Sequence, residues 1–280
     1  MKADLHVHTT ASDGRLAPEE VMTAAAAAGL SHIAITDHDT LDGLAAIMTR
    51  PAASGPVLIP GIEFSTDLPA NEVHVLGYYI DPANSELRRQ LKLITEDRTD
   101  RAERMVAKLA KLGYPLSVDR VLAIAGDTSS VGRPHVAAAL IEQGYFPDNK
   151  TVFAAVLGHD RPGYVPHYKL TPADTIAIIK GAGGLAVLAH PGLVGDDAIV
   201  KEVITLGLDG LEVYHPRHDP AETARYAALA AACQLLVTGG SDFHGIPGRF
   251  PEKLGVFTVP GELAERLATL SRHEYAPDGI

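Results

Sequence analysis

A chain of 280 residues with 46% hydrophobic and 21% charged residues is long enough for one large α/β domain, or for such a domain with a sizeable insertion. Its formal net charge of −11 argues against a protein that holds duplex nucleic acid by neutralising phosphates. The sequence has no run of 18 apolar residues and no signal-peptide pattern after Met1, so we expect a cytoplasmic protein with no membrane partner. The single cysteine, Cys233, suits a reducing compartment and is expected to be buried.

The first part of the chain alternates short apolar segments with helical ones. Strands are predicted at 2–8, 32–36, 57–62 and 72–80, and a helix at 18–28. The helix has a proline in its first turn and Gly29 at its end, as is common at helix termini. This alternation is typical of an α/β fold with a largely parallel sheet.

The middle of the chain is helical. Leu87, Leu91 and Ile94 recur at helical spacing, and the pattern continues to Gly113. Shorter helices are predicted at 118–125, 134–143 and 151–157. We interpret residues 84–165 as a helical insertion (cap) domain, with 1–83 and 166–280 together forming one barrel domain.

The strand and helix alternation returns after the insertion. The predicted elements are a helix at 172–180, strands at 185–190, 208–214, 235–239 and 255–259, and a helix at 262–271. About seven strands, each tending to be followed by a helix, favour a closed (β/α) barrel similar to a TIM barrel. In such barrels the chemistry lies at the carboxyl ends of the strands.

Histidines and carboxylates recur at those strand ends. His6 and His8 are two residues apart in an extended strand, so their imidazoles point to the same side and can hold a transition metal. Similar residues occur in the first loop and near later strand ends: Asp13, Asp37, His38, Asp39, Glu63, His74, His190, Asp242 and His244. Because catalytic barrels collect functional residues at one rim, this repetition predicts a metal site there.

These segments resemble the PHP family, named for polymerase and histidinol phosphatase. The resemblance rests on His6-Val7-His8, Asp13-Gly14, Thr36-Asp37-His38-Asp39, Gly61-Ile62-Glu63, His190-Pro191 and Ser241-Asp242-Phe243-His244. It implies a distorted (β/α)7 barrel, related to that of the amidohydrolases, with three divalent metal ions. It also implies the ligands: His6, His8, Glu63 and Asp242 for one ion, Glu63, His74 and His190 for a second, and Asp13, His38 and His244 for the third. Imidazole and carboxylate ligation suits manganese, iron or zinc, and we expect manganese.

Clustered divalent ions point to hydrolysis of phosphate esters. They turn bound water into hydroxide near neutral pH and neutralise charge on the phosphoryl oxygens, so a metal-bridging hydroxide is expected to attack phosphorus. Glu63 and Asp242 then count as catalytic residues through the ions that they hold. His215 or His218 is expected to protonate the leaving alcohol.

Candidate substrate-binding residues lie in the insertion and after a later strand. Arg133 and His135 follow Gly132 at the start of a predicted helix, whose positive end favours an anion. His167, Arg217 and His218 complete the predicted substrate-binding set. The insertion resembles that of PHP phosphatases acting on nucleoside 3′,5′-bisphosphates, in which equivalents of Arg133, His135 and His218 lie near substrate phosphates.

The leading prediction is therefore a phosphatase that removes the 3′-phosphate of a nucleoside 3′,5′-bisphosphate such as adenosine 3′,5′-bisphosphate. Alternatives within the family are a cyclic phosphodiesterase, a 5′-3′ exoribonuclease acting on short RNA, and a histidinol-phosphate phosphatase. Alternatives outside the family are a metal-binding regulatory module and an amidohydrolase acting on C–N bonds. The predicted partner is a small phosphorylated substrate, a nucleotide, and the oligomeric state is not predicted.

Overall fold

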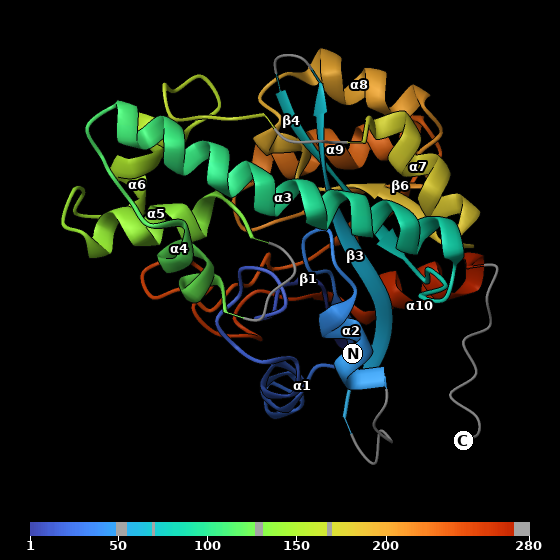
Figure 1. The fold of residues 1–280 in the computed structure, drawn as a ribbon. Coiled ribbons are helices and arrows are strands. Elements are labelled where there is room, and N and C mark those ends of the chain that lie inside the picture. The colour runs from blue at the N-terminus through green and yellow to red at the C-terminus, as the bar shows by residue number, and fades with distance from the viewer. Residues whose placement is uncertain (49–54, 69–70, 127–130, 167–169, 272–280) are drawn as a thin grey trace. The chain divides into compact units, whose positions relative to one another are not determined.

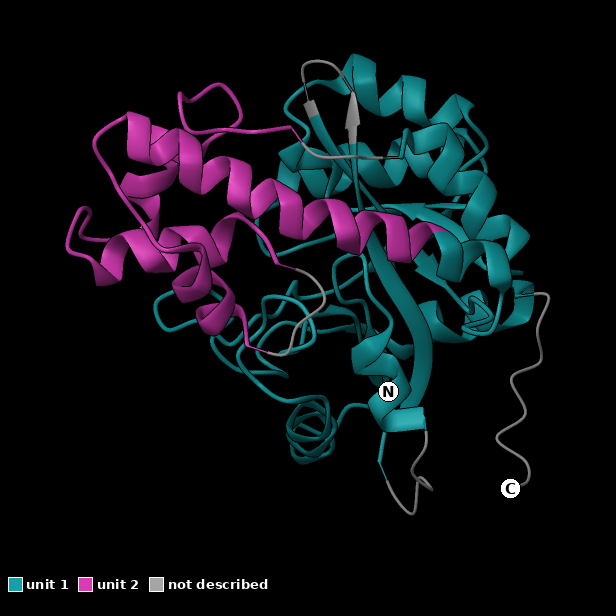
Figure 2. Ribbon diagram, in the orientation of Figure 1, with its two compact units in different colours: residues 1–89, 169–280 teal, residues 90–168 magenta. Residues whose placement is uncertain are grey.

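The computed structural model describes residues 1–48, 55–68, 71–126, 131–166 and 170–271. The chain divides into two compact units, residues 1–89 with 169–280, and residues 90–168 (Figure 2). We call the first the barrel unit and the second the helical unit.

The barrel unit is built around one sheet of eight described strands in the order β7-β6-β5-β4-β3-β2-β1-β8. Figure 1 labels β1, β3, β4 and β6 of this sheet. Their bounds are β1 (Lys2–Val7), β2 (His32–Ile35), β3 (Val57–Leu68), β4 (Asn71–Tyr78), β5 (Leu185–Leu188), β6 (Gly210–Tyr214), β7 (Leu236–Gly239) and β8 (Val259–Pro260). Val7 at the end of β1 bridges Phe243 after β7, and the His8 amide donates to the Phe243 carbonyl at 2.9 Å. The sheet therefore nearly closes, which confirms the predicted barrel.

The sheet is less parallel than the sequence predicts. β1, β2 and β3 are parallel, as are β5, β6 and β7, but β4 is antiparallel to both β3 and β5. Only residues 69–70 separate β3 from β4, whereas a parallel connection needs a crossover of a dozen or more residues. The prediction of a strand ending at residue 62 was therefore too short, because β3 continues into this hairpin.

Helices accompany the strands of the barrel unit. They are α1 (Pro18–Ala27), α2 (Asp42–Met48), α7 (Pro172–Gly181), α8 (Asp197–Thr205), α9 (Pro220–Ala232), α10 (Gly261–Leu270) and the 3₁₀ turn η2 (Pro191–Leu193). Their ends follow ordinary capping chemistry: the Thr171 side chain accepts from the Asp174 amide before α7, and Gly29 follows α1 with a φ of +71°. α2, which is only seven residues long, was not predicted from the sequence.

The helical unit holds its own apolar core. α3 (Ser85–Lys111) begins in the barrel unit and continues into the helical unit, which also contains α4 (Val118–Ala125), α5 (Arg133–Glu142), α6 (Asn149–Val152) and the π-helix η1 (Phe153–Leu157). Buried side chains such as Met105, Leu109 and Leu140 form this core. Burying an aliphatic side chain of this size stabilises a fold by about 2 kcal/mol, so the unit has substantial packing energy of its own.

In the described residues, no helix combines the length and apolar character needed to cross a bilayer. Cys233 is exposed after the end of α9, so the prediction of a buried thiol was wrong. The apolar run around this residue belongs to a helix and a strand whose connection faces solvent.

Candidate metal centre

Strand alternation in β1 separates an apolar face from a polar one. Leu5 and Val7 belong to hydrophobic clusters of the barrel unit, whereas His6 and His8 face a set of imidazoles and carboxylates. The other members come from β3, β4 and the segments that follow strands β1, β2, β5 and β7: Asp13, His38, Glu63, His74, His190, Asp242 and His244. All nine predicted ligands therefore lie in one cluster of the barrel unit.

Glu63, on β3, lies at the middle of this cluster and is fully buried. Five ring nitrogens lie within 3.2 Å of its carboxylate: those of His6, His8 and His38 at 3.2 Å from Oε2, and those of His74 and His190 at 2.9 and 3.0 Å from Oε1. The two oxygens thus face separate groups of imidazoles. A single carboxylate in this position is able to bridge two metal ions.

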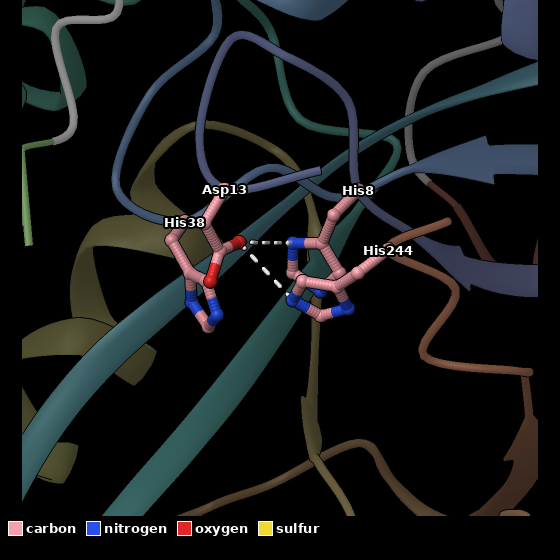
Figure 3. Close-up of side chains that lie close together, drawn as sticks. All are labelled: His8, Asp13, His38 and His244. Carbon is pink, nitrogen blue, oxygen red and sulfur yellow. Dashed lines mark ion pairs between the residues drawn. The ribbon is translucent and has the colours of Figure 1, made fainter. Parts of the chain in front are cut away.

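A second group surrounds Asp13 (Figure 3). One ligand atom each from His8, Asp13, His38 and His244 can be chosen so that all four atoms lie within 4.8 Å of one another. Asp13 Oδ1 lies 3.1 Å from His244 Nε2 and 3.9 Å from His8 Nδ1. His244 Nδ1 donates to the Asp242 carbonyl at 2.8 Å, so its other ring nitrogen, Nε2, is the one that can bind a metal ion beside Asp13.

Asp242 directs its two oxygens to different neighbours. Oδ1 faces the cluster and lies 3.3 Å from His8 Nε2 and 3.7 Å from His6 Nε2. Oδ2 lies 2.7 Å from the Arg249 guanidinium and 3.6 Å from His215 Nε2. Asp242 therefore connects the cluster with Arg249 and His215, and nothing in the sequence pattern pointed to Arg249.

The carboxylates and imidazoles of the cluster shift one another's pKa values. Burial would raise the pKa of Glu63, but the neighbouring imidazoles, His38 foremost, hold that pKa well below its usual range. Burial alone would lower the pKa of His8 and His74, but nearby carboxylates raise these values to about 9 and about 10. The pKa of His38 falls to about 3 because burial dominates there. The cluster thus combines ionised carboxylates with protonated imidazoles at His8 and His74 and a neutral imidazole at His38.

The donor atoms fit a metal centre. Among the buried polar atoms that have no hydrogen-bond partner within the described residues, six belong to this cluster or to the neighbouring His215: His8 Nδ1, His38 Nδ1, His74 Nε2, His215 Nε2, Asp13 Oδ1 and Glu63 Oε2. Buried polar groups without partners are rare and costly in folded proteins, and a bound ion is a recognised explanation. Imidazole and carboxylate donors without thiolates suit divalent manganese, iron or zinc.

Backbone conformation at the strand ends is also unusual. Asp39, His190 and Asp242 have φ values of 53°, 25° and 51°, in the left-handed region that side chains other than glycine rarely adopt. Such backbone strain is concentrated at functional sites, where surrounding hydrogen bonds hold it in place.

Two carboxylates at the end of β2 have a supporting role in the structure. Asp37 accepts from the Thr9 amide at 2.7 Å, the Thr9 hydroxyl at 2.8 Å and the Ser12 hydroxyl at 2.6 Å. It thereby fixes the loop that carries Asp13. Asp39 accepts from the Ser65 amide at 3.0 Å, two residues beyond Glu63 on β3.

The predicted general acids and substrate-binding residues are divided between the two units. His215 and His218 follow β6 and are buried, whereas Arg217 is exposed. In the helical unit, His135 Nδ1 accepts from the Gly132 amide at 3.0 Å. The Arg133 guanidinium lies 5.6 Å from the Phe153 ring centre and 5.7 Å from that of Tyr164. His167 lies outside the described residues.

Comparison with known proteins agrees with this geometry. A family model described as the PHP domain matches residues 4–111. The chain is 36% identical to a 3',5'-nucleoside bisphosphate phosphatase from Chromobacterium violaceum, over 90% of each chain. It is 34% identical to a phosphoribosyl 1,2-cyclic phosphate 1,2-diphosphodiesterase from Eggerthella lenta, over 90% of this chain and 97% of that protein. It is also 36% identical to the 5'-3' exoribonuclease Rnm of Escherichia coli, over 86% of this chain and 84% of that protein.

Solved structures show the same fold. A crystal structure of a putative metal-dependent phosphoesterase from Bifidobacterium adolescentis matches with a TM-score of 0.83 and 31% identity, over 95% of both chains. The structure of an amidohydrolase from Chromobacterium violaceum matches with a TM-score of 0.84 and 34% identity, over 95% of this chain and 97% of that chain.

A nearly closed barrel with imidazoles and carboxylates clustered at the carboxyl ends of its strands defines a metal-dependent hydrolase. The relatives, named as a phosphatase, a phosphodiesterase and an exoribonuclease, identify the bond that it cleaves as a phosphate ester. The chain belongs to the PHP family, and it is a metal-dependent phosphoesterase.

Proposed function

We propose that the cluster holds three divalent ions, preferably manganese. His6, His8, Glu63 and Asp242 would hold one ion, Glu63, His74 and His190 a second, and Asp13, His38 and His244 the third. The position of Glu63 supports this division, because each of its oxygens faces a different group of imidazoles. The group of four donors around Asp13 supports the third ion.

The bound ions would lower the pKa of a water molecule and neutralise charge on the phosphoryl oxygens. The chain's own contribution is to fix the donor atoms before substrate arrives. Asp37 holds the loop that carries Asp13, and the Arg249 guanidinium holds Asp242 Oδ2 at 2.7 Å. Fixed donors and charges of this kind stabilise a transition state without having to reorganise during the reaction.

Hydrogen bonding favours His215 over His218 as the group that protonates the leaving alcohol. His218 Nδ1 donates to the Val213 carbonyl at 2.9 Å, and its Nε2 accepts from the Gly192 amide at 3.1 Å, so both ring nitrogens are engaged. His215 Nδ1 accepts from the Arg217 amide at 3.2 Å, so Nε2 is the ring nitrogen that can exchange a proton with the leaving alcohol. That buried nitrogen has no hydrogen-bond partner among the described residues and faces Asp242 Oδ2.

For the substrate, we propose a nucleoside 3′,5′-bisphosphate that loses its 3′-phosphate. The observation that carries this choice is the 36% identity to the Chromobacterium violaceum bisphosphate phosphatase over 90% of both chains. Arg133 would bind a substrate phosphate from the first turn of α5, where the helix dipole favours an anion and His135 caps the helix. His135 and His167 complete the proposed phosphate-binding residues of this part of the chain.

A second candidate is release of nucleotides from the 5′ end of short RNA, since the Escherichia coli exoribonuclease is equally identical at 36%. The net charge of −11 disfavours a long polyanion. Both candidates use the same metal centre, so they differ only in the part of the substrate that lies outside it.

One experiment separates these activities. Purified protein loaded with Mn²⁺ is given adenosine 3′,5′-bisphosphate, phosphoribosyl 1,2-cyclic phosphate, a short 5′-phosphorylated RNA and histidinol phosphate in parallel. We expect the highest kcat/KM for the bisphosphate, with release of inorganic phosphate. A higher kcat/KM for the RNA or the cyclic phosphate would refute the proposed substrate. It would still be consistent with a metal-dependent phosphoesterase.

A further inference from the structure

Glu212 is a fully buried carboxylate on β6 that contacts two of the proposed metal ligands without belonging to the ligand set. Its Oε1 lies 3.1 Å and its Oε2 3.3 Å from Nδ1 of His6. Oε2 also accepts from the backbone amide of His190 at 2.7 Å. One side chain on β6 therefore links ligands that come from β1 and from the end of β5.

The contact with His6 fixes where that ring carries its hydrogen. An ionised carboxylate only accepts hydrogen bonds, so His6 Nδ1 must be the donor. The nitrogen on the other side of the ring, Nε2, is then the one available to a metal ion. It lies 3.1 Å from His8 Nε2 and 3.2 Å from Glu63 Oε2, inside the cluster.

The contact with His190 acts on the backbone instead. His190 has φ 25° and ψ 63°, a conformation that a residue with a side chain keeps only when its surroundings hold it there. The short hydrogen bond from its amide to Glu212 provides such support. With the backbone held in this way, His190 Nε2 lies 3.0 Å from Glu63 Oε1.

We propose that Glu212 is a positioning residue that sets the metal affinity of this centre, by orienting the His6 ring and by holding the strained backbone of His190. Carboxylates that accept from a ligating imidazole fix its orientation and raise its basicity, and losing them costs about 10–100-fold in metal affinity. The inference rests on the proposed ligand set, but it does not depend on which phosphate ester is cleaved.

If Glu212 only stabilised the fold, replacing a residue with a similar structural contact should weaken metal binding equally. Asp209 is such a residue and provides the matched control. Asp209 lies immediately before β6, and its Oδ2 accepts from the Ala186 amide of β5 at 2.9 Å. Both side chains therefore connect the β5 segment with β6: Asp209 at the start of β6, and Glu212 near its end. Its other contact is an ion pair with Lys180 at 3.1 Å, and it has no described contact with a histidine ring.

The test is a chelator competition titration of wild type, Glu212→Gln and Asp209→Asn with Zn²⁺ and with Mn²⁺, alongside the bound metal content of each protein. Glutamine keeps the shape of Glu212, and its amide oxygen can still accept from the His190 amide, but its NH₂ group then faces His6 Nδ1. His6 loses the anion that holds hydrogen on Nδ1. We expect at least one ion to bind about 10–100-fold more weakly in Glu212→Gln, and wild-type affinity in Asp209→Asn.

Wild-type metal affinity and metal content in a folded Glu212→Gln protein would overturn the inference, as would an equal loss in both variants. If the glutamine variant does not fold, ¹⁵N NMR of histidine-labelled, Zn²⁺-loaded wild type gives an independent answer, with His6 assigned by comparison with His6→Gln. We expect coordination through Nε2 with hydrogen on Nδ1, and coordination through Nδ1 would overturn the inference. Failure of the wild type to bind divalent ions would instead refute the proposed metal centre.

Discussion

Replacing Glu63 by glutamine removes one negative charge from the middle of the cluster and keeps the size of the side chain. The two carboxylate oxygens of Glu63 lie within 3.2 Å of five histidine ring nitrogens, and the carboxylate is fully buried. The substitution therefore changes charge and donor strength while leaving the packing of β3 and β4 in place. We expect Glu63→Gln to lose two of the proposed ions together.

The magnitude follows from the charge that is lost. Two unit charges about 4 Å apart interact by about 4 kcal/mol at an effective dielectric constant of 20, and a divalent ion held directly by the carboxylate feels at least this much. Because 1.36 kcal/mol corresponds to a factor of ten, each of the two ions should bind about a thousandfold more weakly. Turnover at micromolar metal should fall by about a hundredfold or more, since the lost ions activate water and neutralise phosphoryl charge.

The assay combines bound metal content after gel filtration with the initial rate of phosphate release. Glu262→Gln, an exposed position in the first turn of α10, serves as the control and should match wild type in both. Thermal unfolding by circular dichroism verifies that each variant is folded. A folded Glu63→Gln protein that keeps its full metal content, with turnover within about tenfold of wild type, would refute the bridging role that we assign to this residue.

Three further predictions concern other parts of the site. Arg133→Ala should raise KM about tenfold or more with unchanged metal content, because a charge-assisted bond to phosphate is lost, and an unchanged KM would remove Arg133 from the site. His215→Asn should lower kcat about a hundredfold while metal content stays constant, and wild-type kcat would exclude His215 as the acid. Metal binding at pH 7 should release protons, since the raised pKa values of His8 and His74, about 9 and about 10, keep both rings protonated until a metal displaces the hydrogen. Affinity should therefore increase as the pH rises toward 9, and calorimetry in buffers of different ionisation enthalpy that detects no proton release would contradict these pKa shifts.

The clustering of the nine proposed ligands could be predicted because it follows from local rules. Alternation in β1 places His6 and His8 on one side, and parallel strands bring their carboxyl ends to one edge of the sheet. The family resemblance then supplied the remaining residues. The hairpin of β3 and β4 was harder to predict, because the second half of β3 contains polar residues whose partners lie on β4. Thr66, for example, donates from its hydroxyl to the Val73 carbonyl at 2.7 Å.

The supporting residues could not be recognised from the sequence. Glu212 is a single carboxylate between Leu211 and Val213 in a buried strand, and its partner His6 is 206 residues away in the chain. Arg249 lies in a loop, with no motif that connects it to Asp242. A lone charged residue flanked by apolar ones in a strand predicted to be buried was the available signal for Glu212, since such a charge requires a partner.

The most direct test of the account is to identify the product of adenosine 3′,5′-bisphosphate. The metal-loaded protein is incubated with this nucleotide, the reaction is stopped with a chelator, and the adenosine monophosphates are separated by chromatography. We predict adenosine 5′-monophosphate and one equivalent of inorganic phosphate, with no reaction in a sample stripped of metal beforehand. Adenosine 3′-monophosphate as the product, or no turnover by protein that carries its bound ions, would contradict the account.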